Sequence, residues 1–280
     1  METIDLHVHS CHSDGTLTPT ELVDLAVKQG LSAIALTDHD TTTGVEEAVK
    51  AGKRAGLEVI PGVELSTRYK EKEIHILGYF IDYQDETLNK SLEKIATERD
   101  NRNRKMCESL TAGGFPISYE ELTENFGDAI ITRAHFAKLL VKKGVLQSMD
   151  EAFRGCLNNN SPCYVMRRYP TPKEAVELIL NAGGIPVLAH PLLYKMSVSD
   201  LHTLITELIG YGLQRIETFY SCNQGTDEAF VRKLAKEHGL IMTGGSDFHG
   251  ANKPHIMLGT GKGHLIVSKE LLNHLKNPVS

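Results

Sequence analysis

Short apolar segments alternate along most of the chain with longer segments in which apolar residues recur every three or four positions. The short segments predict seven β-strands, at residues 4–8, 33–37, 58–63, 73–80, 185–189, 215–220 and 240–244. Helices are expected after most of them. The first begins at Thr18-Pro-Thr-Glu, where Thr18 can cap the helix and Glu21 can complete a capping box. This alternation favours a parallel sheet, either open or closed into a barrel.

The middle of the chain departs from the alternation. Residues 87–110 have a long, charged, helical pattern, and further polar helical segments continue to about residue 160, where Asn158-Asn-Asn-Ser-Pro interrupts them. We therefore expect a helical insertion at residues 98–162 that caps the substrate site. It would divide a barrel built from residues 1–97 and 163–280.

The composition is that of an ordinary globular protein, and together with the sequence pattern it argues against membrane and secreted proteins. The 280 residues carry a formal net charge of −6, and 41% of them are hydrophobic and 24% charged. No apolar run approaches the roughly 20 residues that cross a bilayer, and the opening METIDLHVHS lacks the pattern of a signal peptide. A cytoplasmic location without a membrane partner is therefore expected. The mild acidity disfavours stable binding of duplex DNA but is compatible with a local basic pocket for one phosphorylated ligand.

The cysteine spacing and the absence of two catalytic motifs exclude further kinds of functional site. The five cysteines show no CxxC spacing, so they suit neither a disulfide framework nor a thiolate zinc site. The sequence contains neither the Gly-x-Ser-x-Gly of serine hydrolases nor a Walker A loop. The chemistry must come from other residue types.

Histidines and carboxylates recur at one place in the predicted strand–helix units, the end of a strand or the turn after it. Eight residues fit this description, and a ninth, His75, lies inside the predicted strand 73–80. The nine are His7, His9, Asp14, His39, Glu64, His75, His190, Asp247 and His249. A single His-x-His pair, or a lone core histidine, would mean little, but chance placement does not explain the shared position. The C-terminal ends of barrel strands face one cavity, so these side chains are expected to converge. Imidazole together with carboxylate suits Zn, Mn or Fe.

Five segments around these residues resemble the motifs of the PHP (polymerase and histidinol phosphatase) phosphoesterase superfamily, in the same order. They are Asp5-Leu-His-Val-His-Ser, Thr37-Asp-His-Asp, Pro61-Gly-Val-Glu-Leu, Ala189-His-Pro and Gly245-Ser-Asp-Phe-His. The resemblance covers residues 1–80 and 163–265. It implies an α/β fold, a distorted seven-stranded (β/α)7 barrel, with a trinuclear metal site.

The family pattern also implies how three divalent ions would be held. The first ion would bind His7, His9, Glu64 and Asp247, the second would bind His75, His190 and the bridging Glu64, and the third would bind Asp14, His39 and His249. Many relatives have a histidine where this chain has Asp14, which makes the third site richer in oxygen here. Mn²⁺ is the expected metal, with Fe²⁺ and Zn²⁺ as alternatives.

A shorter resemblance narrows the expected activity. The segments Thr132-Arg-Ala-His-Phe-Ala, and Tyr164-Val before Thr171-Pro-Lys-Glu-Ala, are similar to bacterial nucleoside 3′,5′-bisphosphate phosphatases, some of which trim short RNA from its 5′ end. The similarity implies that Arg133 and His135 bind a second, non-reacting phosphate, since guanidinium matches phosphate in a bidentate manner. The alternative is an ordinary insertion helix with a solvated Arg133.

The resemblance implies a phosphatase that removes the 3′-phosphate of nucleoside 3′,5′-bisphosphates, for example converting adenosine 3′,5′-bisphosphate to AMP. A metal-bridging hydroxide would be the nucleophile, Glu64 the bridging ligand, and a small nucleotide or short single-stranded RNA the substrate. Two alternatives stay open: another phosphomonoesterase of the superfamily, such as one acting on histidinol phosphate, and a catalytically silent metal-binding module. The sequence does not identify the group that protonates the leaving alkoxide.

Overall fold

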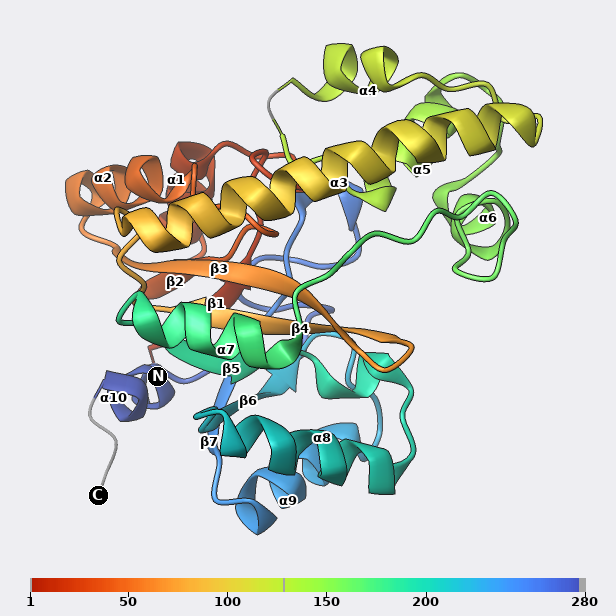
Figure 1. Ribbon diagram of the computed structural model, residues 1–280. Helices are drawn as coiled ribbons and strands as arrows, with labels where there is room; N and C mark the ends of the chain where they lie inside the picture. The colour runs from red at the N-terminus through yellow and green to blue at the C-terminus, as the bar shows by residue number, and fades with distance from the viewer. Residues whose placement is uncertain (1, 128, 277–280) are drawn as a thin grey trace.

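Seven strands form one curved sheet in the computed structural model, which describes residues 2–127 and 129–276 (Figure 1). In chain order, which is also their order in the sheet, they are β1 Ile4–Val8, β2 Ala33–Leu36, β3 Glu58–Tyr69, β4 Lys72–Tyr79, β5 Ile185–Leu188, β6 Arg215–Tyr220 and β7 Ile241–Gly245. A bridge between Val8 and Phe248 joins the end of β1 to the segment that follows β7, so the sheet is a nearly closed barrel. Gly245 permits this approach, because a Cβ there would lie 2.4 Å from the backbone nitrogen of His7. The predicted seven-stranded barrel is confirmed.

One strand runs against the others, which differs from the parallel sheet expected. β4 is antiparallel to both β3 and β5, while the remaining neighbours are parallel. Only Lys70 and Glu71 connect β3 to β4, whereas a parallel crossover needs a dozen or more residues. β3 also continues to Tyr69, past the expected end at Val63, because it pairs with β4 along its length. The two strands form a long hairpin.

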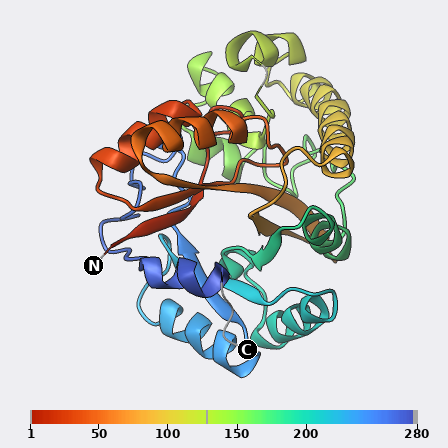
Figure 2. The same cartoon turned by 90° about the vertical axis from the view of Figure 1, so that its left-hand side faces the viewer.

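Helices cover the outside of the barrel, as the alternation predicts (Figure 2). They are α1 Pro19–Lys28, α2 Val45–Ala55, α7 Pro172–Asn181, α8 Val198–Gly210, α9 Asp227–Glu237 and α10 Lys269–Lys276, with the short 3₁₀ helices η1 Pro191–Tyr194 and η2 Gly250–Asn252. α1 begins with the predicted capping box, in which the side chains of Thr18 and Glu21 accept hydrogen bonds from each other's backbone amides. Among the residues described, none of the helices combines the length and hydropathy needed to cross a bilayer.

A second group of helices lies on one side of the barrel, between β4 and α7 in the sequence (Figure 1). It contains α3 Glu86–Ala112, α4 Tyr119–Phe126, α5 Arg133–Lys142 and α6 Met149–Arg154. α3 is continuous through residue 98, and its C-terminal half shares an apolar cluster with the other three helices. Met106, Leu110 and Phe136 are fully buried in that cluster. These helices therefore have a hydrophobic core of their own.

The segment that contains α4, α5 and α6 begins and ends at nearly the same point. α3 ends at Gly113, and a Cβ at that position would lie 2.5 Å from Sγ of Cys163, where the chain returns toward the barrel. Cys163 is itself buried in the apolar cluster of the helices. The segment between the two residues is thus an excursion that begins and ends at one place on the fold.

Candidate metal centre

The structure brings the nine histidines and carboxylates singled out in the sequence to one place. His7 lies in β1, His9 directly after it and Asp14 in the next loop, while His39 follows β2, His190 follows β5, and Asp247 and His249 follow β7. Glu64 was expected to follow β3, but it lies within that strand because the hairpin extends it. His75 lies within β4, where it pairs with Ser66 in the register of the hairpin.

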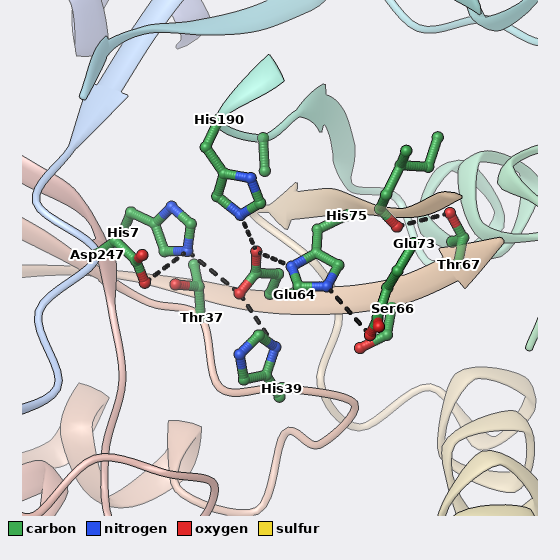
Figure 3. A network of polar contacts seen from close by, with 12 residues as sticks. His7, Thr37, His39, Glu64, Ser66, Thr67, Glu73, His75, His190 and Asp247 are labelled. Atoms are coloured by element: carbon green, nitrogen blue, oxygen red, sulfur yellow. Dashed lines mark hydrogen bonds and ion pairs between the residues drawn. The ribbon is translucent and has the colours of Figure 1, made fainter. Parts of the chain in front are cut away.

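The Glu64 carboxylate stands at the middle of the group (Figure 3). Five histidine rings surround it, each with a nitrogen 2.8–3.3 Å from one of its oxygens: His75 and His190 at Oε1, and His7, His9 and His39 at Oε2. Glu64 is fully buried. A single carboxylate therefore links ligands from both halves of the chain.

The remaining ligands extend the group to either side of Glu64. Asp14 Oδ1 lies 3.2 Å from Nε2 of His249, and Asp247 Oδ1 lies 3.4 Å from Nε2 of His9. The nine residues form four overlapping groups close enough to hold an ion: His9, Asp14, His39 and His249; His7, Glu64 and His190; His7, His9 and Asp247; His39, Glu64 and His75. Because four residues belong to two groups each, the division among three ions stays a proposal.

The chemistry of these donors fits divalent cations. Several of their buried atoms have no hydrogen-bond partner among the described residues: His7 Nε2, His9 Nδ1 and Nε2, Asp14 Oδ1, His39 Nδ1, Glu64 Oε2 and His190 Nδ1. Buried polar atoms without partners are costly, and native proteins contain few of them. Imidazole nitrogen with carboxylate oxygen is a donor set that Zn²⁺, Mn²⁺ and Fe²⁺ accept, so the residues present suit such ions.

Burial and charge set the protonation of these side chains differently from one residue to the next. Burial acts to raise the pKa of Glu64, but His39 and His7 outweigh it and hold that pKa well below its usual value. The pKa of Asp14 is likewise held low, since His249 and His39 outweigh its burial. Burial lowers the pKa of His39 to about 3, against the pull of Glu64. At neutral pH the carboxylates are anionic and His39 is neutral, the forms that bind metals. Burial acts to lower the pKa of His9 and His75, but neighbouring carboxylates outweigh it and raise these pKa values to about 9 and about 10, so a bound ion would displace protons from these two rings.

Glu217 in β6 holds two of the histidines, and the sequence analysis did not single it out. Its Oε1 lies 2.9 Å from Nδ1 of His7, and its Oε2 accepts a hydrogen bond from the backbone amide of His190 at 2.7 Å. A carboxylate on the second nitrogen of a metal-binding histidine fixes the ring and its tautomer. The sequence shows Glu217 as one of several polar residues in the predicted strand 215–220, which does not indicate what it contacts.

Two further carboxylates hold the loops that carry ligands, and both belong to motifs that the sequence showed. Asp5 accepts hydrogen bonds from the backbone amides of Ser246 at 2.8 Å and Gly259 at 2.8 Å, next to Asp247. Asp38 accepts from the backbone and hydroxyl of Ser10, in the loop leading to Asp14. The acidic positions of these motifs thus support the site without facing it.

Two of the nine residues have left-handed backbone conformations. φ is 23° at His190 and 58° at Asp247, values that a non-glycine residue adopts at some cost. The bond from His190 N to Glu217 and the bond from Tyr220 Oη to Asp247 Oδ2, at 2.7 Å, hold these residues in place. The surrounding barrel therefore enforces the positions of the ligands.

A pocket of about 430 Å³ adjoins the ligands and separates them from the helical group. Its lining contains Asp14, His39, His75 and His249 of the metal centre, Arg99 and Arg102 of α3, Arg133 of α5, Met149 and Phe153 of α6, and Lys253. The pocket thus combines candidate metal ligands, positive charge and an apolar surface.

Three buried arginines, Arg99, Arg102 and Arg167, lie close together beside this pocket, and two of them share one carboxylate. Arg99 and Arg167 both bind the buried Asp40, the latter at 3.1 Å. Within the described residues, Arg102 has one hydrogen-bond contact, to Sδ of Met106 at 3.4 Å, and its Nε has none. Burial and the nearby Arg99 lower the pKa of Arg102 to about 10, which leaves it charged at neutral pH. Arg99 and Arg102, called the arginine corner below, carry excess positive charge, as an anion site requires.

The structure places the two predicted phosphate-binding residues of the insertion differently. Arg133 is the first residue of α5 and lines the pocket, with its guanidinium bound to Asn159 and to Glu73. His135 is buried and does not line the pocket. Its Nδ1 accepts a hydrogen bond from the backbone of Thr132 at 2.9 Å, because a residue at this position of a capping box turns back toward the helix start. The structure therefore brings Arg133 to the pocket but not His135.

An enzyme that cleaves phosphate esters with the help of metals uses cations at the reacting phosphate, and preorganised positive charge around it stabilises the transition state. The nitrogen and oxygen donors around Glu64 can hold the cations, and the arginine corner supplies the positive charge. The molecule is accordingly a metal-dependent phosphoric ester hydrolase.

Comparison with known proteins makes this assignment more specific. The chain belongs to the PHP domain family, whose model matches residues 5–177. It is 37% identical over 246 residues to a 5′-3′ exoribonuclease of Haemophilus influenzae, covering 88% of this chain and 89% of the relative. It is also 37% identical over 250 residues to a 3′,5′-nucleoside bisphosphate phosphatase of Chromobacterium violaceum, covering 89% and 88%. The family expected from the five motifs is confirmed.

The fold has a matching solved structure. A protein of Bifidobacterium adolescentis that is described as a metal-dependent phosphoesterase superposes with a TM-score of 0.87 at 30% identity. The match covers 98% of this chain and 95% of the other. The barrel and the helical group therefore occur together in that protein as well.

Proposed function

We propose that this enzyme removes the 3′-phosphate of nucleoside 3′,5′-bisphosphates, for example converting adenosine 3′,5′-bisphosphate to AMP. The observation that carries the proposal is the presence of the metal centre and the arginine corner in one pocket. A substrate with two phosphates uses both, with its reacting phosphate at the metal centre and its second phosphate at Arg99 and Arg102. The name of the Chromobacterium violaceum relative supports the same substrate.

In this proposal the nine ligands hold three divalent ions, Mn²⁺ in the first place with Fe²⁺ and Zn²⁺ as alternatives. When bound, the ions would supply activated hydroxide and polarise the phosphoryl oxygens. Hydrolysis breaks the bond between phosphorus and O3′ of the ribose, and O3′ takes up a proton. Lys253 lines the pocket with its Nζ 2.7 Å from Oδ2 of Asp247, and we assign its ammonium to neutralising charge on the reacting phosphate.

The rim of the pocket suits a nucleoside. Met149 and Phe153 belong to the lining, and Phe153 is 37% exposed although it is aromatic. A base stacked on an exposed aromatic ring contributes about 1–3 kcal/mol. The volume of about 430 Å³ also falls in the range of roughly 300–1,000 Å³ that is usual for small-molecule sites.

Trimming of short single-stranded RNA from its 5′ end is the second activity that we propose for this pocket. A 5′-terminal phosphate at the arginine corner would place the next phosphodiester at the metal centre, with the spacing of a nucleoside bisphosphate. The exoribonuclease of Haemophilus influenzae supports this activity by its name. A phosphomonoesterase for histidinol phosphate is disfavoured, because one phosphate would leave Arg102 without a partner. A silent module is disfavoured, because all nine ligand positions carry competent side chains.

The proposal predicts a preference for two phosphates that depends on Arg102. We expect Mn²⁺-loaded enzyme to release phosphate from adenosine 3′,5′-bisphosphate faster than from adenosine 3′-phosphate. A charged hydrogen bond contributes about 1.5–3 kcal/mol, so Arg102→Ala should lower kcat/KM on the bisphosphate by roughly ten- to a hundredfold. The 3′-monophosphate should be affected little, since it makes no contact there.

The exposed Arg104 on the same helix provides the matched control, because its partner is Glu120 on the surface. Arg104→Ala should leave both substrates unchanged, and thermal unfolding checks that each variant is folded. An equal loss on the two substrates in folded Arg102→Ala would show that the arginine corner does not select the second phosphate.

A further inference from the structure

Glu73 connects the candidate metal ligand His75 to the group of helices α3 to α6. It lies in β4 two residues before His75, so both side chains point to the same face of the hairpin. Its Oε1 is 3.5 Å from Nε2 of His75 (Figure 3). Its Oε2 accepts hydrogen bonds from Oη of Tyr169 at 3.1 Å and from Nη2 of Arg133 at 3.2 Å. The carboxylate thus touches the barrel, the insertion helix α5 and the segment after the insertion.

The two nitrogens of His75 face two different carboxylates. Nδ1 lies 2.8 Å from Glu64 at the centre of the ligand group, while Nε2 faces Glu73 at its edge. His7 shows the same arrangement, with Nε2 toward Glu64 at 3.2 Å and Nδ1 toward Glu217 at 2.9 Å. In both rings one nitrogen is directed to the metal centre and the other to an outer carboxylate, which fixes a metal-binding histidine.

The two outer carboxylates differ in what holds them. Glu217 is enclosed in the barrel and receives the backbone amide of His190. Glu73 has a side chain that is 22% exposed, and Arg133 from the insertion holds it. The same arginine also binds Asn159, so both of its terminal nitrogens are engaged within the protein. Arg133 is therefore placed to act on Glu73 more directly than on a substrate phosphate.

We propose that Glu73 is a positioning residue that orients His75 for metal binding, and that Arg133 acts through Glu73. The inference rests on the proposal that His75 binds a divalent ion, and it is independent of the choice of substrate. A purely structural ion pair between barrel and insertion would change stability alone. Metal affinity in the absence of substrate therefore separates the two roles.

The test is the affinity of metal-free protein for Mn²⁺, measured by competition with a chelator and by elemental analysis. Glu73→Gln should weaken the binding of one ion by about ten- to a hundredfold and should change the melting temperature of metal-free protein little. Glu71→Gln is the matched control, because Glu71 lies in the turn of the same hairpin with its side chain 88% exposed and pairs only with Arg68 among the described residues. It should bind Mn²⁺ like the wild type.

Arg133 is tested with a double variant. If Arg133 acts through Glu73, Arg133→Ala should weaken Mn²⁺ binding too, and the combination with Glu73→Gln should be no weaker than Glu73→Gln alone. Arg133→Ala should also lower turnover of the bisphosphate and the 3′-monophosphate alike. Wild-type Mn²⁺ affinity in Glu73→Gln would overturn the inference, and so would losses that add in the double variant. Neither result would touch the proposed substrate, which the Arg102 comparison tests.

Discussion

Asp40 shows how one residue controls the charge beside the site. Its carboxylate is fully buried, binds Arg99 and Arg167, and accepts a hydrogen bond from the backbone amide of Ser66 at 2.8 Å. Burial acts to raise the pKa of Asp40, but the two arginines outweigh it and lower that pKa to about 2. The single negative charge of Asp40 is shared by Arg99 and Arg167, so the positive charge of Arg102 has no carboxylate partner among the described residues and is available to an anion.

Asp40→Asn should destabilise the protein by about 3–5 kcal/mol, because it leaves two buried arginines without a counter-charge. Urea unfolding measures the difference. Glu46→Gln is the control, since Glu46 and Lys50 form an exposed pair that contributes about 0–1 kcal/mol. The pKa of Asp40 is depressed on folding, so its contribution should be complete above the unfolded value near 4 and should disappear as pH falls toward 2. A loss below about 1 kcal/mol at pH 7 would mean that solvent or an anion already compensates the arginines.

At this scale the sequence predicted the histidines and carboxylates that the structure brings together, but not the residues that hold them in place. The nine candidate ligands could be found because they are histidines and carboxylates, most of them near a recognisable strand end. Glu217 binds His7 from 210 positions away, and no local pattern indicates such a contact. The substrate role expected for His135 came from the resemblance of its segment to bisphosphate phosphatases, and that resemblance did not show that His135 caps α5 and does not line the pocket.

The hairpin of β3 and β4 is the element that shapes the metal centre. Alternating apolar residues indicate a strand but not its direction. The signal that β4 is antiparallel was the connection between β3 and β4, which is too short for a parallel crossover. The polar residues after Val63 concealed the second half of β3, which is visible only through its pairing with β4. The hairpin puts Glu64 and His75 in mid-strand, where backbone hydrogen bonds fix them more firmly than a loop would.

This placement predicts that the candidate ligands contribute unequally to metal binding and to turnover. Glu64 contacts five histidines, whereas His249 contacts Asp14 and Asp247 at one side of the group. Glu64→Ala should therefore lower both turnover and the metal content per chain further than His249→Ala, because losing a central carboxylate leaves neighbouring cations to repel each other. Elemental analysis of the two purified variants measures the difference. Equal metal loss would argue against a bridging position for Glu64.

Over the whole molecule, the ligands come from β1, β3, β4 and the segments after β1, β2, β5 and β7. Ions bound by all of them connect nearly every part of the barrel. Such ions bind the folded chain only, so they should stabilise it by mass action.

Removing the metal should therefore lower both stability and activity. A chelator should abolish hydrolysis, and it should lower Tm by roughly 5–10 °C if the ions are present at about a hundred times their Kd. Mn²⁺ should restore both properties better than Ca²⁺, which prefers a shell of oxygen ligands. Scanning calorimetry and a phosphate-release assay at matched metal concentrations measure the two effects. Full activity in metal-free protein would contradict the function proposed for the centre.

The meeting of Gly113 with Cys163 has an evolutionary consequence. A segment whose two ends coincide can be exchanged for one of another length without displacing the framework that carries it. Such an exchange would replace α5 and α6, with Arg133, Met149 and Phe153, and it would leave Arg99 and Arg102 beside the metal ligands. If the proposed function holds, descendants of this architecture would acquire a new preference for the base and would inherit the proposed phosphate site and the metal centre intact.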